Sequence, residues 1–352
     1  MLKLIKKAVK NLPLIKSLVS QRDMLRQSLD EMFAERKELR MDGYRLRQQR
    51  DLLTAERDEL VAHLEPTRLE LKRLKRNQGV VEAGHFYSPI PSFDQIAKDQ
   101  SRIFDQMNLA TPGVDLNAEA QLQLLGSFVD FYRDLPFTPD KIQGLRYYFE
   151  NPAYSYSDAI LLHCMMRHLK PNRVIEVGSG FSSCMILDTN ELFFKRSIKT
   201  TFIEPHPELL QSLLEDTEND NIEIIPSQLQ HIDLSLFDEL QANDILFIDS
   251  THVSKIDSDV NRIIFEILPR LASGVYIHFH DIIYPFEYPR KWVLQGRAWN
   301  EAYLLKAFLQ FNHSFRTVLM NSYLNQFHRE FFEENMPLCL NNTGASIWIR
   351  KD

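Results

Sequence analysis

Two histidines and two aspartates stand directly after apolar runs of the sequence. Asp249 and His252 follow one such run, and His280 and Asp281 follow the next. An imidazole can take a proton from a hydroxyl group, and neighbouring carboxylates can orient polar ligands. His252 alone would more often be a surface histidine than a base. Because polar groups end several successive runs, we nevertheless take His252, Asp249 and Asp281 as candidate catalytic residues.

A second group of candidates surrounds a glycine-containing turn. A β-branched run at 174–177 predicts a buried parallel strand, and it ends at Gly178, Ser179 and Gly180. Phe181 then begins a predicted helix. Glycines at a strand-to-helix turn allow the backbone to approach a ligand, and the first amides of the helix face a polar group there. The turn therefore indicates a nucleotide-type pocket, with a turn that binds no ligand as the alternative.

Glu176 helps to choose between nucleotides. It lies two residues before the first glycine, where a carboxylate would repel a pyrophosphate but could bind a positively charged methionyl amine. Ser183 also occupies the place of the third glycine of the dinucleotide pattern. These residues favour S-adenosylmethionine over NAD.

Polar residues follow the next predicted strands as well. Glu204 ends the strand 200–204 and could accept both ribose hydroxyls, although a helix cap is the alternative. Gln228 follows the strand 222–225, where it could meet an adenine edge. Asp249 is expected to face the same pocket.

The elements that position these residues alternate between strands and helices after residue 170. Such alternation predicts an α/β fold with a doubly wound, Rossmann-like sheet, which binds ligands at the carboxyl ends of its strands. The predicted strands are 174–177, 200–204, 222–225, 244–249, 274–279, 315–320 and 345–350.

Composition limits the other functions. The 352 residues carry a net charge of −7, which argues against a nucleic-acid partner. Three scattered cysteines suit buried thiols in a reducing compartment. No apolar run reaches the ~18 residues of a membrane span, and residues 1–22 lack the apolar core of a signal peptide. We therefore expect a cytoplasmic protein.

The N-terminal part divides into three segments. Residues 1–22 combine lysines and apolar residues at helical spacing, which predicts a basic amphipathic helix that could lie on the inner membrane face. Residues 23–78 repeat an apolar residue every seven positions, which predicts a long helix and a weak coiled coil that could form a homo-oligomer. A single solvated helix is the alternative. Residues 79–150 are expected to be a linker and a helical lead-in, with helices at 118–133 and 139–150, before a catalytic domain at 151–352.

The pattern Glu176-x-Gly178-x-Gly180, the acid Glu204 and the acid Asp249 together resemble a class I S-adenosylmethionine-dependent methyltransferase over about residues 150–350. The pieces 151–158, 176–183, 248–252 and 278–301 resemble bacterial enzymes that methylate sugars of polysaccharides and natural products. The basic and heptad segments resemble extensions of that group.

The resemblance implies a seven-stranded sheet of order 3-2-1-4-5-7-6 with strand seven antiparallel. It also implies that Glu176, Gly178 and Gly180 bind the methionyl part, with Ser179 in the same turn. Glu204 would bind the ribose, and Gln228 the surroundings of the adenine.

Metal-dependent members of this group carry an Asp-x-x-His after strand four and an acidic pair after strand five. Asp249 and His252 match the first pattern, but His280 stands where those enzymes have a carboxylate. Asp249, His280 and Asp281 are therefore candidate ligands for Mg²⁺ or another divalent ion.

The expected function is an S-adenosylmethionine-dependent O-methyltransferase of polysaccharide biosynthesis, acting on a hydroxyl of a sugar, glycan or glycosylated intermediate. His252 would be the general base, and the aromatic and arginine-rich stretch 282–299 a lid or acceptor platform. The alternatives are a metal-using hydroxylase-like enzyme on the same fold and a non-catalytic coiled-coil scaffold with a degenerate domain. A dehydrogenase is disfavoured by Glu176.

Overall fold

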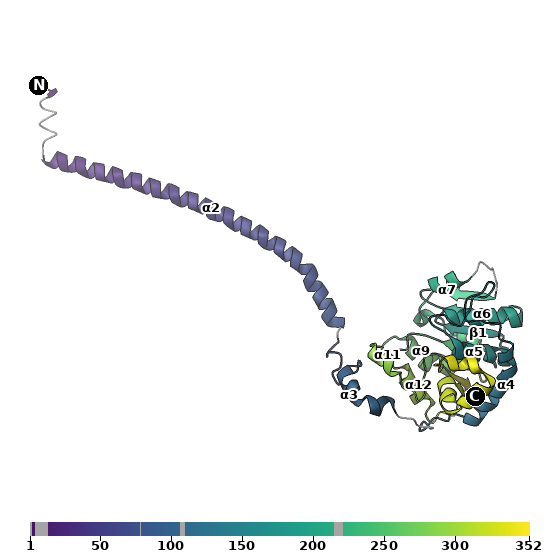
Figure 1. The fold of residues 1–352 in the computed structure, drawn as a ribbon. Helices are drawn as coiled ribbons and strands as arrows, with labels where there is room; N and C mark the ends of the chain where they lie inside the picture. Colours follow the sequence, from purple (N-terminus) through teal and green to yellow (C-terminus); the bar gives the residue numbers. More distant parts are fainter. Residues whose placement is uncertain (1, 4–12, 78, 106–109, 215–220) are drawn as a thin grey trace. The chain divides into compact units, whose positions relative to one another are not determined.

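The structure is a computed structural model that describes residues 2–3, 13–77, 79–105, 110–214 and 221–352 (Figure 1). The chain forms two compact units, Met1–Ala83 and Gly84–Asp352. Residues 84–150 of the predicted linker and lead-in thus belong to the same unit as the predicted catalytic domain. Of the predicted basic helix at 1–22, residue 1 and residues 4–12 lie outside the described residues, and residues 13–22 are the start of a longer helix. Among the helices that are described, none combines the length and hydropathy of a membrane crossing.

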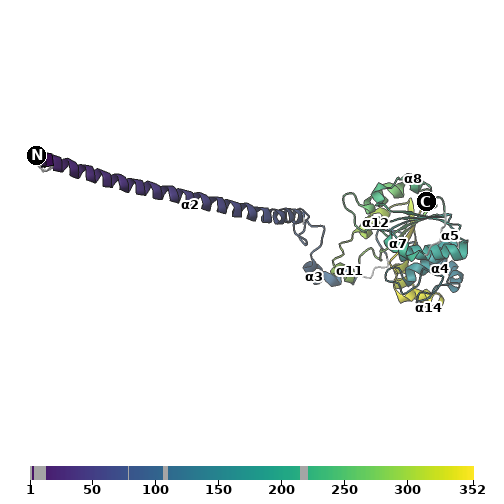
Figure 2. The same cartoon turned by 90° about the horizontal axis from the view of Figure 1, so that it is seen from above.

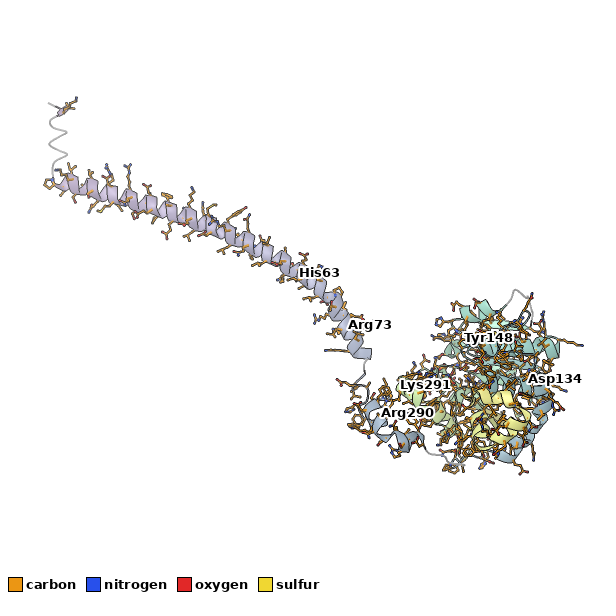
Figure 3. All side chains as sticks on the ribbon, in the orientation of Figure 1. His63, Arg73, Asp134, Tyr148, Arg290 and Lys291 are labelled. Atoms are coloured by element: carbon orange, nitrogen blue, oxygen red, sulfur yellow. The ribbon has the colours of Figure 1, made fainter. Side chains whose placement is uncertain are left out.

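The described part of the first unit consists mainly of one long helix. Helix α2 (Pro13–Asn77) has 65 residues and continues through Pro66. Its described side chains project outward along its length, as the labelled His63 and Arg73 do in Figure 3. The long helix predicted from the heptad repeat is confirmed, whereas its pairing stays a prediction.

The second unit is built around a sheet with helices packed on it (Figures 1 and 2). The sheet has seven strands in the order β3-β2-β1-β4-β5-β7-β6. Strands β1 to β5 pair in parallel, and β7 is antiparallel to both β5 and β6. This confirms the strand order that the resemblance implied. The strands are β1 (Arg173–Val177), β2 (Lys199–Ile203), β3 (Ile222–Ile225), β4 (Ile245–Ile248), β5 (Tyr276–Phe279), β6 (Phe315–Met320) and β7 (Ile347–Lys351).

The centre of the sheet is the core of this unit. Every side chain of β4 is buried, because helices cover both faces of the parallel strands. On one face α5 contacts both α4 and α6. The helical segments are α3 (Phe93–Phe104), α4 (Ala118–Arg133), α5 (Tyr156–Leu169), α6 (Phe181–Phe194), α7 (Glu208–Leu213), η1 (Leu229–His231), α8 (Ser235–Asp238), α9 (Asp259–Arg262), η2 (Ile263–Ile267), α10 (Leu268–Arg270), α11 (Arg290–Leu294), α12 (Glu301–Leu309), α13 (Asn321–Phe327), α14 (Arg329–Asn335) and η3 (Pro337–Asn341).

The helix predicted at 139–150 is wrong, because this segment forms turns. Asp188 of α6 holds it in that shape. The carboxylate accepts hydrogen bonds from the backbone amides of Arg146 and Tyr147, both at 2.8 Å, and from the Arg146 guanidinium at 2.7 Å. These amides are therefore satisfied by a side chain instead of by a helical carbonyl.

We expect Asp188→Ala to lower the free energy of unfolding by about 3–5 kcal/mol, because it leaves the nearly buried Arg146 guanidinium and two amides without their acceptor. Urea unfolding followed by circular dichroism measures this. The matched control is Glu191→Gln, whose partly exposed carboxylate also contacts Arg146 and should cost about 1 kcal/mol or less. Equal losses in the two variants would contradict the role given to Asp188.

Candidate active site

The turn after β1 approaches the end of β4 very closely. Gly178 has a φ of +85°, and a Cβ atom on it would lie 1.9 Å from the carbonyl oxygen of Asp249. Only glycine fits there, for steric and conformational reasons together. The turn and the first residue after β4 are consequently adjacent.

Glu176 lies behind this turn and is fully buried. Its two oxygens accept hydrogen bonds from the Ser182 and Ser183 hydroxyls at 2.5 and 2.7 Å. The Ser183 hydroxyl also accepts one from the Gly180 amide at 3.0 Å. Burial raises the pKa of Glu176 to about 8, although the two serines oppose this shift. Glu176 thus stabilises the start of α6 through these hydrogen bonds. Its contact with a methionyl amine stays a prediction.

A cavity of about 390 Å³ opens at the carboxyl ends of the parallel strands. Four of the predicted cofactor-binding residues line it together: Gly178, Glu204, Gln228 and Asp249. Glu204 is held by hydrogen bonds from the amides of Ser179, at 3.2 Å, and His206, at 2.8 Å. Ser179 therefore acts on the cavity wall through Glu204.

Asp259 is a wall residue that the sequence did not indicate. It accepts hydrogen bonds from the amide and the hydroxyl of Thr251, at 2.9 and 2.6 Å, and so fixes the segment after β4. It is the first residue of α9, and an acid in the first turn of a helix is common whether or not it contacts a ligand.

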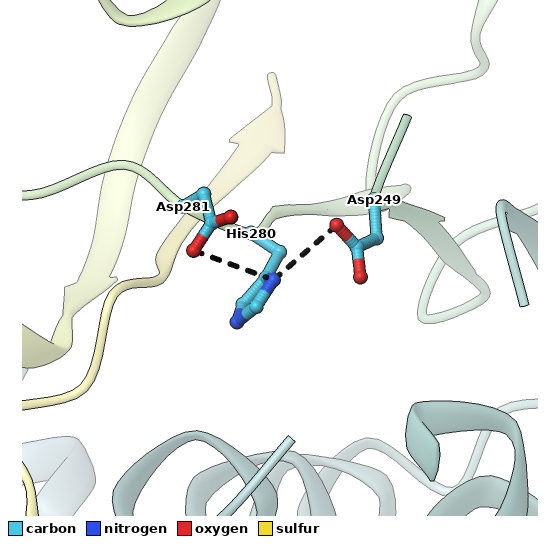
Figure 4. A group of neighbouring side chains, drawn as sticks. All are labelled: Asp249, His280 and Asp281. Carbon is cyan, nitrogen blue, oxygen red and sulfur yellow. Dashed lines mark ion pairs between the residues drawn. The ribbon is translucent and has the colours of Figure 1, made fainter. Parts of the chain in front are cut away.

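The predicted catalytic residues form one cluster at the ends of β4 and β5. The Nδ1 atom of His280 lies 3.3 Å from Asp249 and 3.7 Å from Asp281 (Figure 4). The Nε2 atom of His252 lies 3.4 and 3.5 Å from the same two carboxylates. The structure therefore brings together all four residues that the sequence proposed for catalysis or metal binding.

Charge and burial set the protonation of this cluster. Burial favours neutral imidazoles, but Asp249 and Glu301 outweigh it and raise the pKa of His252 to about 10. Asp249 and Asp281 likewise raise the pKa of His280 to about 10 against the effect of burial. Burial also opposes ionisation of Asp249, yet the two imidazoles hold its pKa below the usual range. With only protein groups around them, both histidines are cations at neutral pH.

Glu301 completes the environment of His252. It is fully buried at the start of α12, and its carboxylate lies 2.8 Å from the Nδ1 atom of His252. The amides of Asn300 and Glu301 donate to the His252 carbonyl at 3.1 and 3.2 Å, and the Trp299 ring packs 4.4 Å from the imidazole. Sequence reasoning missed Glu301, because 49 residues separate it from His252.

Asp249, His280 and Asp281 could hold a divalent metal ion. One ligand atom from each lies within 4.8 Å of the other two. Within the described residues, the buried Nδ1 atom of His280 has no hydrogen-bond partner of good geometry. Two carboxylates and an imidazole suit several divalent ions. The residues therefore fit such an ion once His280 releases its Nδ1 proton, and the binding of an ion stays a prediction.

Three comparisons with known proteins extend these observations. Residues 175–282 match a family model described as a methyltransferase domain. An uncharacterized protein of Archaeoglobus fulgidus is 37% identical over 166 residues, which cover 46% of this chain and 73% of that protein.

Two solved structures are similar at low scores. A Podospora anserina methyltransferase with bound S-adenosylhomocysteine is 12% identical, with 74% of this chain and 94% of that chain covered and a TM-score of 0.40. The O-methyltransferase TomG of Streptomyces achromogenes, in complex with S-adenosylmethionine, is 13% identical, with 73% and 96% covered and a TM-score of 0.37.

The pKa of Glu176 predicts a dependence of stability on pH. Between about pH 4.5 and 8 the folded chain keeps a proton on Glu176 that the unfolded chain releases. This contribution is complete below about pH 4.5 and is lost as the pH rises. The stability of Glu176→Gln relative to wild type should increase by up to about 1.4 kcal/mol per pH unit in this range.

Chemical denaturation at a series of pH values measures that difference. Above about pH 8 the difference should become constant, because Glu176 is then ionised in both states. A difference that is flat from pH 4.5 to 8 would contradict a protonated Glu176.

Proposed function

The chain belongs to the same protein family as the archaeal relative and carries a methyltransferase domain, and from this premise we propose that it is an S-adenosylmethionine-dependent O-methyltransferase acting on a hydroxyl of a sugar or glycan. One observation carries the proposal. Gly178, Glu204, Gln228 and Asp249 line one cavity, and Asp249 also belongs to the acid–imidazole cluster. A bound cofactor would therefore adjoin the groups that could activate an acceptor.

The charge of the cavity supports a cationic cofactor. Three carboxylates line it, those of Glu204, Asp249 and Asp259, and its described lining contains no lysine or arginine. A dinucleotide would bring a pyrophosphate into this negative field, whereas a sulfonium brings a positive charge. Each oxygen of Glu204 accepts one amide and has a second lone pair for a ribose hydroxyl.

We assign the base to His252, with Glu301 fixing its ring. The short contact at Nδ1 leaves Nε2 facing Asp249 and Asp281. A protonated imidazole cannot take a proton. His252 can therefore act as the base only if another cation offsets the charge of these two carboxylates and so lowers the pKa of His252. A divalent ion held by Asp249, His280 and Asp281 would supply such a charge and would lower the pKa of a bound hydroxyl.

A second cavity, of about 600 Å³, supports a sugar acceptor. It adjoins the segment that follows Asp281, and its lining includes Phe104, Tyr284, Phe286, Tyr288, Arg290 and Lys306. The carboxylates of Asp105 and Glu287 line it as well, so its charge is mixed. Aromatic side chains offer apolar faces on which a sugar ring can pack, and the two cations can bind an acidic substituent.

The wall of this second cavity is connected to the base. Tyr288 packs against Trp299, with ring centroids 5.9 Å apart, and Trp299 packs against His252. The Tyr288 hydroxyl also accepts a hydrogen bond from the Ala302 amide, next to Glu301. An acceptor in the second cavity would therefore lie on the His252 side of the site.

We expect His252→Ala to retain binding of S-adenosylhomocysteine and to lose methyl transfer by on the order of 10²–10⁴-fold. The assay incubates purified protein with labelled S-adenosylmethionine and cell-envelope glycan fractions, and calorimetry measures binding. The exposed His313 gives the control His313→Ala, which should behave as wild type.

Three outcomes would count against the assignments. Full transfer by His252→Ala would show that His252 is not the base. A melting temperature raised by NAD and not by S-adenosylhomocysteine would refute the cofactor. Full activity of protein shown to be metal-free after chelation would mean that Asp249, His280 and Asp281 act without an ion.

We also expect Arg290→Gln and Lys306→Gln to raise KM for acidic glycan fractions about tenfold, with little change in kcat, because each variant removes a charge-assisted contact to the acceptor. Neutral fractions should be unaffected. Lys291→Gln is the matched control, since Lys291 neighbours Arg290 on α11 but does not line the cavity (Figure 3). Equal effects on acidic and neutral fractions would contradict the charge argument.

A further inference from the structure

Helix α2 carries an apolar stripe that no described residue of its own unit covers. We propose that residues 18–75 of α2 pair with the same residues of a second copy of this chain, as a parallel, in-register, two-stranded coiled coil. The proposal concerns α2 alone and does not depend on the enzymatic function.

The stripe is regular and exposed. From residue 18 to residue 74, every seventh residue is leucine or methionine, with Thr67 as the single exception. Between 49% and 70% of each of these side chains is exposed. The members of this stripe are Leu18, Leu25, Met32, Leu39, Leu46, Leu53, Leu60 and Leu74. Such a seven-residue repeat is the seam along which two helices pack.

The two flanks of the seam carry opposite charges. The position three residues after the seam is acidic at Glu35, Asp42, Glu56 and Glu70. The position one residue after the seam is basic at Arg26, Arg40, Arg47, Arg68 and Lys75. Within the described part of α2, none of Glu35, Arg40 and Arg47 forms an ion pair, so these charges are available to another chain. Asp42 and Glu70 pair within α2 with Arg45 and Arg73, and these exposed pairs would be exchanged for pairs to the second copy.

This distribution selects the orientation of the second copy. In a parallel, in-register pair, each acidic-flank residue faces the basic-flank residue five positions later in the other helix. Glu35 then faces Arg40, Asp42 faces Arg47, and Glu70 faces Lys75, each pair occurring twice by symmetry. An antiparallel pair would instead place acidic flank against acidic flank and basic against basic.

The arginines beside the seam fit the same arrangement. The companion position of the repeat, four residues after the seam, holds Arg22, Gly43, Arg50, Arg36 and Arg57, where an apolar residue would bind more strongly. In the parallel pair Arg36 and Arg57 each approach the acid that precedes them in the other copy, Glu35 or Glu56. The arginines therefore weaken the pair while remaining compatible with two parallel strands.

Disulfide trapping tests orientation and register. Leu25→Cys and Leu60→Cys, made separately, should each give a disulfide-linked dimer under mild oxidation, because identical seam positions meet only in a parallel, in-register pair. The three native cysteines are buried and should not interfere. Gln27→Cys and Ala62→Cys, which lie two residues off the seam, are the matched controls and should remain uncrosslinked.

Charge reversal tests the flanks. The triple variant Glu35→Lys, Asp42→Lys, Glu70→Lys should raise the dimer Kd at least about tenfold in sedimentation equilibrium of the full chain. Mixing it with the variant Arg40→Glu, Arg47→Glu, Lys75→Glu should restore a heterodimer. Three results would overturn the proposal. They are a monomer at all concentrations, a trimer or larger assembly, and a disulfide that forms only between positions 25 and 60 when the Leu25→Cys and Leu60→Cys variants are mixed.

Discussion

The site depends on how closely the end of β1 approaches the end of β4. Because residue 178 has no side chain, its backbone can lie against the Asp249 carbonyl. The hydrogen-bond ladder then continues past the strands. The Asp249 amide donates to Val177 at 2.9 Å, and the His280 amide donates to Ile248 at 2.9 Å. Gly178, Asp249 and His280 consequently follow one another along the edge of the sheet.

A second constraint is the balance between the charges of the buried carboxylates and imidazoles at this edge of the sheet. Each buried carboxylate or imidazolium would be costly alone, since few waters can solvate it. Asp249 and Asp281 share two imidazoles, and Glu301 contacts one of them from α12. The ionised forms are therefore interdependent, and removing one group changes the protonation of its neighbours.

Sequence reasoning succeeded where the signal was local. Strand ends followed by polar residues placed Gly178, Glu204, Gln228 and Asp249 at one edge, and the structure joins them in one cavity. Contacts between distant segments left no such signal. Glu301 and Asp188 act on residues more than forty positions away, and acids occur in most helices whether or not they contact a distant segment. This is also why the turns at 139–150 were mistaken for a helix.

Glu176 shows a different limit. Its position beside the glycines suggested a ligand, but two serines of the next helix already satisfy both of its oxygens. The sequence contains both serines, but their spacing from Glu176 does not show that they donate to it. Which donor a buried carboxylate uses depends on side-chain direction within the first turn of α6, and residue spacing alone does not determine that direction.

Charge divides the proposed enzyme into three regions with different tasks. Carboxylates dominate the first cavity, acids and imidazoles balance each other in the cluster, and the second cavity carries both signs of charge, with Arg290 and Lys306 beside Asp105 and Glu287. A cationic methyl donor would be favoured in the first cavity, where an acidic acceptor would be disfavoured. Methyl transfer converts a sulfonium into a neutral thioether, so the donor loses the charge that held it among the carboxylates. The same field that selects the cofactor would thus assist release of the product.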